Sequence, residues 1–200
     1  MKYFIALCIA VGFLASCGSS KTETTSVGST AAAAKNNNPH YVISVKVGGE
    51  SIGEIEIELF KDLAPKHVRN FDSLVSVGFY NGTAFHRVIP GFVIQGGDPN
   101  SKSKPKNTWG FGDPGQTKVP AEFNSTPHKR GIVSAARSND PNSATSQFFI
   151  CVDDASSLDN KYTVYGQVVR GMEVADKIVN LPRDERDNPI EKAEMMVTKK

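Results

Sequence analysis

The sequence has few of the residue patterns that most catalytic and nucleic-acid-binding proteins need. Its 200 residues carry 23 Lys and Arg against 21 Asp and Glu, so the net charge is only +2. A nucleic-acid-binding surface needs a concentrated excess of basic residues, and we expect no nucleic-acid partner. The four histidines lie far apart and lack the spacing to cysteine that zinc sites use. No Gly-x-Ser-x-Gly elbow is present, and we expect neither a metal nor a cofactor.

Long helices and disulfide bonds are also disfavoured. The 17 glycines and 11 prolines are scattered among short apolar runs, which is typical of a chain with many turns and excludes a helical bundle. The three cysteines are Cys8, Cys17 and Cys151. If the first is removed and the second modified, as argued next, no intramolecular disulfide is possible. Cys151 lies in an apolar segment and is predicted to be an inert buried thiol.

The N-terminus is predicted to be a targeting segment. Lys2 precedes an apolar run from Phe4 to Leu14, which is shorter than the roughly 20 residues that span a bilayer but suits a signal peptide. The run ends in Leu14-Ala15-Ser16-Cys17-Gly18, which resembles a bacterial lipobox. That resemblance implies cleavage after residue 16 and acylation of Cys17 with fatty acids such as palmitate. The alternative is an ordinary secretory signal that contains a chance cysteine.

The lipobox interpretation divides the chain into three parts. They are a signal peptide over residues 1–16, a lipidated Cys17 with a flexible tether to residue 40, and a folded domain over residues 41–200. The tether has no apolar period to bury. We expect a lipid-anchored protein of the bacterial cell envelope that faces the periplasm or the exterior. Gly18 lacks an acidic retention signal, which by resemblance favours the outer membrane.

The folded domain is predicted to consist of strands punctuated by turns. Residues 41–47 and 54–59 alternate with a period of two, and Gly48-Gly49 between them is a hairpin signal. Further strands are predicted over residues 83–89, 93–95, 131–136, 147–152, 162–169 and 194–198. Helices are predicted over residues 64–77, with Pro65 in the first turn, and over 172–179. About eight strands in an order that is not alternating βαβ favour a closed antiparallel barrel, which leaves no exposed edge.

Several conspicuous patterns carry no chemistry in this interpretation. Residues 110–115 match Gly-x-Gly-x-x-Gly, but a Lys/Pro-rich loop precedes them and Pro120 blocks a helix, so we reject a nucleotide site. The series Glu54, Glu56 and Glu58 is interpreted as a solvated strand face. Residues 100–119, with three lysines alternating with Ser and Pro, are either a specificity loop or a solvated surface turn, and we favour the second.

Three sequence blocks carry a resemblance to a known family. The first runs from Phe85 through His86-Arg87 and Gly91-Phe92-Val93 to Asp98, and the second and third are Ser134–Ser138 and Ser146–Ile150. With Gly78–Thr83 ahead of them, they resemble the cyclophilin family of peptidyl-prolyl isomerases, in family order, from about residue 41 to the C-terminus. The resemblance implies a closed eight-stranded antiparallel barrel capped by two α-helices.

The same resemblance implies a set of site residues. Arg87 is the implied catalytic cation, with Gln95 orienting it. Four apolar side chains are implied to line the proline pocket, and Gln147 to contact the substrate backbone. Ala136 and Arg137 match positions along which the peptide lies, Arg137 chiefly through its backbone. The full substrate-binding prediction is His86, Phe92, Val93, Gln95, Ala136, Arg137, Gln147, Phe149, Leu158 and Tyr162.

These residue types suit the chemistry of an X–Pro bond. Its rotation breaks no bond and transfers no proton, so a cation beside an apolar pocket is sufficient. Three departures from the family pattern are visible: Val93 where many relatives have methionine, Tyr162 where histidine is frequent, and Ser157 where cyclosporin-sensitive relatives have tryptophan. Serine replaces neither the indole N–H donor nor its flat surface, and we expect weak cyclosporin binding.

Two further hypotheses remain beside an isomerase that assists the folding of exported proteins. The first is a lipid-anchored chaperone or binding module for proline-containing segments, in which turnover is incidental. The second is a carbohydrate-binding or adhesive β-domain. The second needs an exposed aromatic platform, whereas the single Trp109 lies in a loop with only Phe111 nearby. We expect the partners to be proline-containing polypeptides and the chain to be a monomer.

Overall fold

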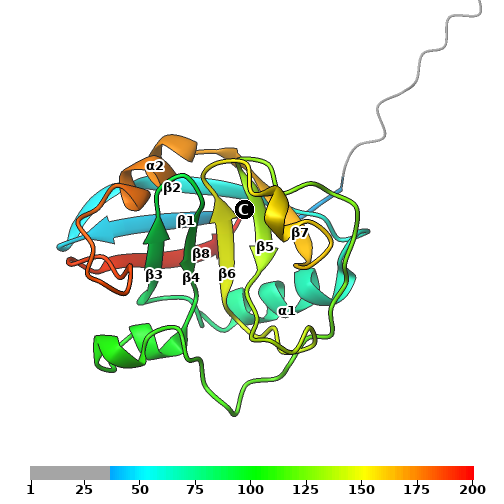
Figure 1. Ribbon diagram of the computed structural model, residues 1–200, viewed down its shortest axis with the longest axis horizontal. Coiled ribbons are helices and arrows are strands. Elements are labelled where there is room, and N and C mark those ends of the chain that lie inside the picture. The colour runs from blue at the N-terminus through cyan, green and yellow to red at the C-terminus, as the bar shows by residue number, and fades with distance from the viewer. Residues whose placement is uncertain (1–36) are drawn as a thin grey trace, which may run out of the picture. The chain divides into compact units, whose positions relative to one another are not determined.

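Eight strands close into one antiparallel barrel in the computed structural model, which describes residues 37–200. Around the barrel the order is β1-β2-β7-β5-β6-β4-β3-β8 (Figure 1). The strands are β1 His40–Val47, β2 Glu50–Leu59, β3 Thr83–Ile89, β4 Val93–Gly96, β5 Ile132–Ala135, β6 Phe148–Cys151, β7 Val164–Arg170 and β8 Ala193–Lys199. The predicted fold class is thereby confirmed. The predicted signal peptide, Cys17 and nearly all of the tether lie outside the described residues.

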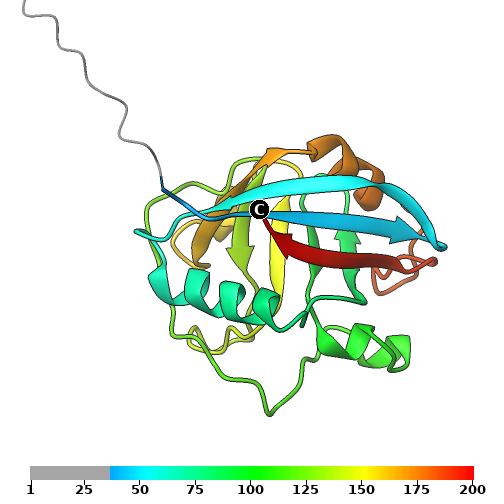
Figure 2. The same ribbon diagram turned by 180° about the vertical axis from the view of Figure 1, so that it is seen from behind.

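Two α-helices cover the barrel from opposite sides. Figures 1 and 2 show α1, Pro65–Ser76, below the strands and α2, Met172–Val179, above them. Three short 3-10 turns lie in the connections: η1 Pro99–Ser101, η2 Lys106–Thr108 and η3 Ser156–Leu158. None of the helices in residues 37–200 has the length and apolar character needed to cross a bilayer.

The first hairpin follows directly from its sequence pattern. Tyr41 of β1 pairs with Ile57 of β2, and Ile43 pairs with Ile55, so both apolar faces point into the barrel. Gly48 and Gly49 have φ angles of 60° and 89°, which glycine adopts without a steric penalty. Alternation and turn chemistry therefore agree, which is why this hairpin was predictable from local sequence.

The strand face with three glutamates is more buried than expected. Glu54 is exposed, but Glu56 and Glu58 are only 6% and 7% exposed. Glu56 accepts a hydrogen bond from Lys200 at 2.8 Å, and this contact lowers the pKa of the Glu56 carboxyl. The solvated-face interpretation is therefore wrong for these two residues, because β7 pairs beside β2 and side chains of Gln167 and Lys200 reach the two carboxylates.

The helix α1 closes the core on its side of the barrel. Pro65 occupies the first helical turn, and Phe71 is buried among aromatic rings of three strands and loops. Its ring lies 5.1 Å from that of Tyr41, 4.9 Å from Tyr80 and 5.8 Å from Phe148, measured between centroids. Edge-to-face and tilted contacts of this kind stabilise a core beyond the area they bury. The main core thus lies between the barrel interior and this helix.

A second, smaller apolar cluster lies apart from the main core. It contains Val93 of β4, Phe149 and Cys151 of β6, Ile132 of β5 and Val164 of β7, together with Ala136 and Ala155. Alternation along β4 and β6 sends Ile94, Phe148 and Ile150 into the main core instead. One face of β4 and β6 therefore packs into the main core, and the other face forms the smaller cluster. The smaller cluster is the floor of the site described next.

Candidate active site

A cavity of about 240 Å³ opens above the smaller apolar cluster. It is lined by residues of β3, β4, β6, the segment after β5 and the region of η3. Nine of the predicted site residues meet here: Arg87, Phe92, Val93, Gln95, Ala136, Arg137, Phe149, Leu158 and Tyr162. We call this the prolyl cavity, because its size and apolar floor suit a pyrrolidine ring.

Strand register brings the central residues of the prolyl cavity together. Arg87 of β3 pairs with Gln95 of β4, and Gln95 pairs with Phe149 of β6. Side chains of directly paired residues point to the same face of a sheet and lie close together. The guanidinium, the amide and the phenyl ring are therefore placed side by side by the barrel itself, and none of the three depends on a loop for its position.

A chain of amide contacts holds the guanidinium. Arg87 Nη1 donates to Gln95 Oε1 at 3.4 Å, and Gln95 Nε2 donates to Gln147 Oε1 at 3.1 Å. Gln147 Nε2 in turn donates to the carbonyl of Gly110 at 3.1 Å. The ion pairs found within residues 37–200 do not include Arg87. Its charge is thus uncompensated by a carboxylate, and most of its five N–H donors remain available to a ligand.

The floor of the prolyl cavity is apolar and almost fully buried. Val93 is 2% exposed and Phe149 is 5% exposed, with Cys151 fully buried beneath them. Burial raises the pKa of the Cys151 thiol to about 12, so the sulfur stays protonated and inert, as its apolar sequence context predicted. A floor of this kind favours apolar and weakly polar groups over charged ones.

One wall of the prolyl cavity is braced by a histidine. His128 Nδ1 lies 2.9 Å from Asp159 Oδ1, and its Nε2 lies 3.0 Å from Ser134 Oγ. The imidazole stacks on Phe149 with 6.0 Å between centroids. This arrangement has the order of a Ser-His-Asp triad, but Ser134 is fully buried and cannot reach a substrate carbonyl. The group therefore supports Phe149 and the end of η3 and is not a hydrolytic centre.

The two site arginines are held differently. Arg137 stacks on the Tyr162 ring with 4.5 Å from Cζ to the centroid, and its guanidinium donates to the carbonyls of Lys161 and Ser138. Tyr162 also meets Phe149 edge-on, with 5.6 Å between centroids. Arg137 is therefore occupied by its own chain and forms part of the wall, whereas Arg87 is free to act on a ligand.

His86 is not part of the cavity lining. Its side chain is 2% exposed and lies against Gly110 of the segment after η2. Burial lowers the pKa of His86 to about 4, so the ring is neutral near pH 7. The ring lines neither cavity of this region, so a direct contact of His86 with substrate stays a prediction. The pairing of β3 with β4 shifts register between Phe85 and Arg87, which breaks strict alternation here: Phe85 and Val88 both lie in the main core, whereas Arg87 lines the prolyl cavity.

Gln147 lines a second cavity, which adjoins the first. The second cavity has a volume of about 290 Å³ and shares Gln95, Ala136 and Arg137 with the prolyl cavity. Its other wall is formed by residues of the segment 110–118. Sequence reasoning missed this wall, although a glycine-rich run is a signal for a loop that approaches other backbone closely.

The segment 100–119 is tied to the folded domain by defined contacts. The buried carboxylate of Asp98 accepts hydrogen bonds from the backbone amides of Asn100, Gly110 and Gly112. Lys106 Nζ donates to the carbonyl of Pro189 at 2.8 Å, which ties the segment to the connection before β8. Most residues between 102 and 118 are nevertheless exposed, as the surface-turn interpretation expects, and a role in specificity stays untested.

The remaining predictions concern ligands and surfaces. Across residues 37–200 no three His, Cys, Asp or Glu side chains gather in a way that could hold a metal ion. Trp109 is 7% exposed and its indole nitrogen donates to the carbonyl of Lys104, so it offers no exposed aromatic platform. Ser157 lies exposed on η3 beside the cavity residue Leu158.

Comparisons with known proteins agree with this geometry. The model of the family "Cyclophilin type peptidyl-prolyl cis-trans isomerase/CLD" matches residues 42–200. The chain is 50% identical over 130 residues to a probable peptidyl-prolyl cis-trans isomerase of Brucella suis, covering 63% of this chain and 66% of that protein. It therefore spans just under two thirds of that relative's length. It is 47% identical over 137 residues to a peptidyl-prolyl cis-trans isomerase of Acinetobacter baylyi, covering 66% and 70%.

Solved structures show the same fold. A cyclophilin-type isomerase of Cryptosporidium parvum superposes with a TM-score of 0.71 at 30% identity, covering 82% of this chain and 98% of that one. A structure of that protein in the presence of the dipeptide Ala-Pro superposes with a TM-score of 0.67 at 30% identity, covering 80% and 97%.

Proposed function

This chain belongs to the family of cyclophilin-type peptidyl-prolyl cis-trans isomerases, and we propose that its prolyl cavity is the active site, in which Arg87 assists rotation about X–Pro bonds. The observation that carries the proposal is the guanidinium held by Gln95 at the edge of an apolar, pyrrolidine-sized cavity. Proline-containing polypeptides are the proposed substrates, and the dipeptide Ala-Pro used with the Cryptosporidium relative supports this class.

The reaction needs a lower rotation barrier and nothing else. A peptide bond has a barrier of about 18–20 kcal/mol, and an X–Pro bond isomerises in roughly tens to hundreds of seconds unaided. Each tenfold acceleration requires that the barrier fall by about 1.4 kcal/mol. Only interactions that are stronger with the twisted amide than with the planar one contribute. The cavity offers two such interactions.

The first is a hydrogen bond from Arg87 to the prolyl nitrogen. In the planar amide the nitrogen lone pair is delocalised, whereas in the twisted amide it is free to accept a hydrogen bond. The available guanidinium donors then bind the transition state more tightly than the ground state. A single preorganised donor of this kind typically contributes about 3–4 kcal/mol.

The second is the apolar floor. Loss of resonance makes the twisted amide less dipolar than the planar amide. Transfer from water to an apolar environment therefore costs the twisted form less free energy than the planar form. Val93 and Phe149 would hold the pyrrolidine ring, which fixes the proline while the rest of the chain rotates. Gln147 and the backbone of Ala136 would bind the adjoining peptide, since both line the second cavity.

The Arg87→Ala variant of the full-length chain in neutral detergent tests the proposal. We expect kcat/KM in a protease-coupled proline-peptide assay to fall about 100- to 1000-fold, because the lost donor acts on the transition state. Binding of the same peptide should weaken less than tenfold. The Arg137→Ala variant is the matched control, and it should lose far less activity because its guanidinium already binds its own backbone. Equal losses in the two variants would refute the role of Arg87.

The same variant separates catalysis from simple binding. The second cavity extends the binding surface beyond the proline, which favours a chaperone or binding module as the second candidate function. If cells that lack the protein are rescued fully by Arg87→Ala, peptide binding is its biological task. If they are not rescued although the variant is produced at normal levels, turnover is required.

We propose that the enzyme acts on exported polypeptides from a lipid anchor at Cys17. The support is the apolar run over residues 4–14 followed by the lipobox-like Leu14-Ala15-Ser16-Cys17. Metabolic labelling with a palmitate analogue should mark the wild type and spare Cys17→Ser, and the label should fractionate with the outer membrane. An unlabelled protein that is cleaved and secreted would support the ordinary signal peptide instead.

A further inference from the structure

Three basic side chains line a shallow cavity beside the active-site region. This basic cavity has a volume of about 270 Å³ and lies between α1 and residues 117–120. Lys66 and Arg69 project from α1, and Lys118 faces them from the opposite wall, with Val119 and Pro120 next to it. All three cationic side chains are exposed.

No carboxylate of the folded domain neutralises these cations. Among the ion pairs formed within residues 37–200, none involves Lys66, Arg69 or Lys118. Glu122 contacts this end of α1, but its oxygens accept from the backbone amides of Lys66 and His67 at 3.0 Å and from His67 Nδ1 at 2.7 Å. Its lone pairs are therefore committed to the helix terminus, and Glu122 is not part of the cavity lining.

The positions of the two helical cations do not favour the stability of α1. Lys66 and Arg69 lie in the first turns of the helix, whose first turn contains no acidic residue. The positive end of the helix dipole disfavours cations there. The stability of α1 thus does not explain why cations occupy positions 66 and 69, whereas binding of an external anion does.

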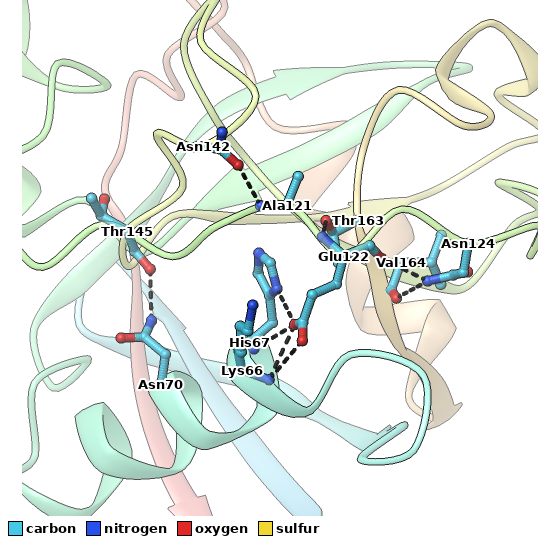
Figure 3. A network of polar contacts seen from close by, with 10 residues as sticks. All are labelled: Lys66, His67, Asn70, Ala121, Glu122, Asn124, Asn142, Thr145, Thr163 and Val164. Carbon is cyan, nitrogen blue, oxygen red and sulfur yellow. Dashed lines mark hydrogen bonds and ion pairs between the residues drawn. The ribbon is translucent and has the colours of Figure 1, made fainter.

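The walls of the basic cavity are fixed relative to each other. Figure 3 shows Glu122 turned toward the first turn of α1, with Asn70 reaching across to Thr145. Asn70 Nδ2 donates to the Thr145 carbonyl at 2.7 Å, and the Glu122 amide donates to Thr163 Oγ1 at 2.9 Å. Because this network ties α1 to the segment that carries Lys118, the cations need little rearrangement to receive a ligand.

The basic cavity adjoins the substrate surface. Lys118 lines both the basic cavity and the second cavity, and the second cavity shares Gln95, Ala136 and Arg137 with the prolyl cavity. A polypeptide that extends from the prolyl cavity across the second cavity would reach Lys118, which borders the cavity of Lys66 and Arg69. This adjacency favours a peptide as the source of the anion over a membrane surface.

We propose that the basic cavity selects substrates with aspartate or glutamate a few residues from the proline. The inference rests on the proposed function, since it requires that proline-containing polypeptides occupy the prolyl cavity. The substrate carboxylate would lie among three cations. The free energy of this contact is the same whether the X–Pro bond is planar or twisted. The preference therefore lowers KM and leaves kcat nearly unchanged.

Peptide series test the proposal on the full-length chain in neutral detergent. One glutamate or one glutamine is placed at each position about two to six residues from the proline, on either side, because an extended chain advances about 3.3 Å per residue. At low salt we expect kcat/KM for the best glutamate peptide to exceed its glutamine partner about threefold to tenfold. The ratio should approach one as salt shortens the screening length.

Variants identify the cations responsible. Lys66→Gln with Arg69→Gln should bring the glutamate-to-glutamine ratio close to one, and Lys66→Arg with Arg69→Lys should retain it. Lys46→Gln, an exposed cation on β1 outside the cavity, is the matched control and should also retain it. A wild-type ratio near one at every position, or a ratio that survives the double glutamine variant, would overturn the proposal.

Two further readouts separate the alternatives. Turnover of the glutamine peptides reports the proposed isomerase activity by itself. If these peptides are not turned over, the proposed function fails, and this failure is distinct from a failure of the selectivity. Addition of phosphatidylglycerol to the micelles tests the other anion source. If the peptide ratio is near one and the double glutamine variant weakens lipid binding, the basic cavity faces a membrane and the peptide proposal fails.

Discussion

The prolyl cavity and the second cavity adjoin each other but are built by different means. The first is made of strand residues in register, with Arg87, Gln95 and Phe149 aligned across β3, β4 and β6. The second is closed by the segment 110–118, which contains no strand and depends on side chains from elsewhere. Chemistry that needs fixed geometry thus sits on the rigid sheet, and the surface that meets variable parts of the substrate sits on a loop.

The largest expected effect tests the dependence of the second cavity on one acid. Asp98→Ala leaves the backbone amides of Asn100, Gly110 and Gly112 without their acceptor. Hydrogen bonds to a buried charge contribute about 1.5–3 kcal/mol each, so we expect the free energy of unfolding to fall by about 3–5 kcal/mol. Chemical denaturation measures this loss, and hydrogen exchange should show it concentrated at residues 110–112.

The matched control for Asp98 is Asp113, an exposed acid in the same segment. It accepts from the Gly115 amide at 2.8 Å, where water can replace it. Asp113→Ala should cost less than about 1 kcal/mol. Equal losses for the two alanine variants would mean that burial of Asp98 does not organise the second cavity.

The next effect concerns pH and the buried ring of His86. The pKa of His86 is about 4 in the folded protein and about 6.5 in an unfolded chain. The unfolded state therefore binds more protons between these values, and stability falls as pH is lowered through this window. We expect a loss of about 3 kcal/mol between pH 6.5 and 4. Burial also lowers the pKa of His67, which acts in the same direction.

Denaturation midpoints of wild type and His86→Gln across pH 4 to 8 measure this contribution. The variant lacks the titrating ring and should show a shallower acid decline than the wild type. An identical slope in the two proteins would assign the acid sensitivity to other groups.

A smaller effect tests the support of Arg87 within the prolyl cavity. Gln95→Leu removes the acceptor at 3.4 Å and lets the guanidinium leave its position. We expect kcat/KM to fall about tenfold to thirtyfold, mainly in kcat, because a misplaced donor is lost from the transition state first. Gln116→Leu, which changes the second cavity, should stay within about threefold on short peptides. A larger loss for Gln116→Leu than for Gln95→Leu would contradict the assignment of catalysis to the prolyl cavity.

The smallest effect concerns the cavity rim at η3. Ser157→Trp adds an indole N–H donor and a flat surface beside Leu158, and we expect cyclosporin affinity to rise about tenfold from a weak starting value. Ser156→Trp, one residue earlier on the same turn, should change it little. Inhibition titrations provide the measurement. Nanomolar inhibition of the unmodified chain would contradict the weak binding expected from Ser157.

Local sequence predicted the elements well, whereas the residues of the prolyl cavity were named from the family resemblance. Residues 93–95 were predicted as a strand, on which Val93 and Gln95 share a face, and the structure finds both in the cavity lining. The bounds of the shortest strands were less accurate: the expected 131–136 is Ile132–Ala135, and 147–152 is Phe148–Cys151. Barrel closure sets these ends, because each strand pairs only as far as both of its neighbours extend.

Errors arose wherever a residue's surroundings come from distant parts of the chain. Glu56 was expected in solvent, but it is buried beside Lys200, which follows it by 144 residues. His86 was named from the family resemblance, and the structure buries its ring against Gly110, which follows it by 24 residues. The support of Phe149 by His128 and Asp159 has no local signal, since their 31-residue separation matches no helical or strand period.

The amino-acid sequence by itself determined which segments become strands, where the first hairpin turns and where α1 begins. These properties depend on neighbours a few positions away, and hydrophobic periodicity, glycine and proline encode them directly. Only the tertiary structure decided that Asp98 would organise residues 110–112 and that Lys66 and Arg69 would face Lys118. Cavities form where a barrel closes and loops pack on it, and the contacts that shape them join residues with no periodic relation in the chain.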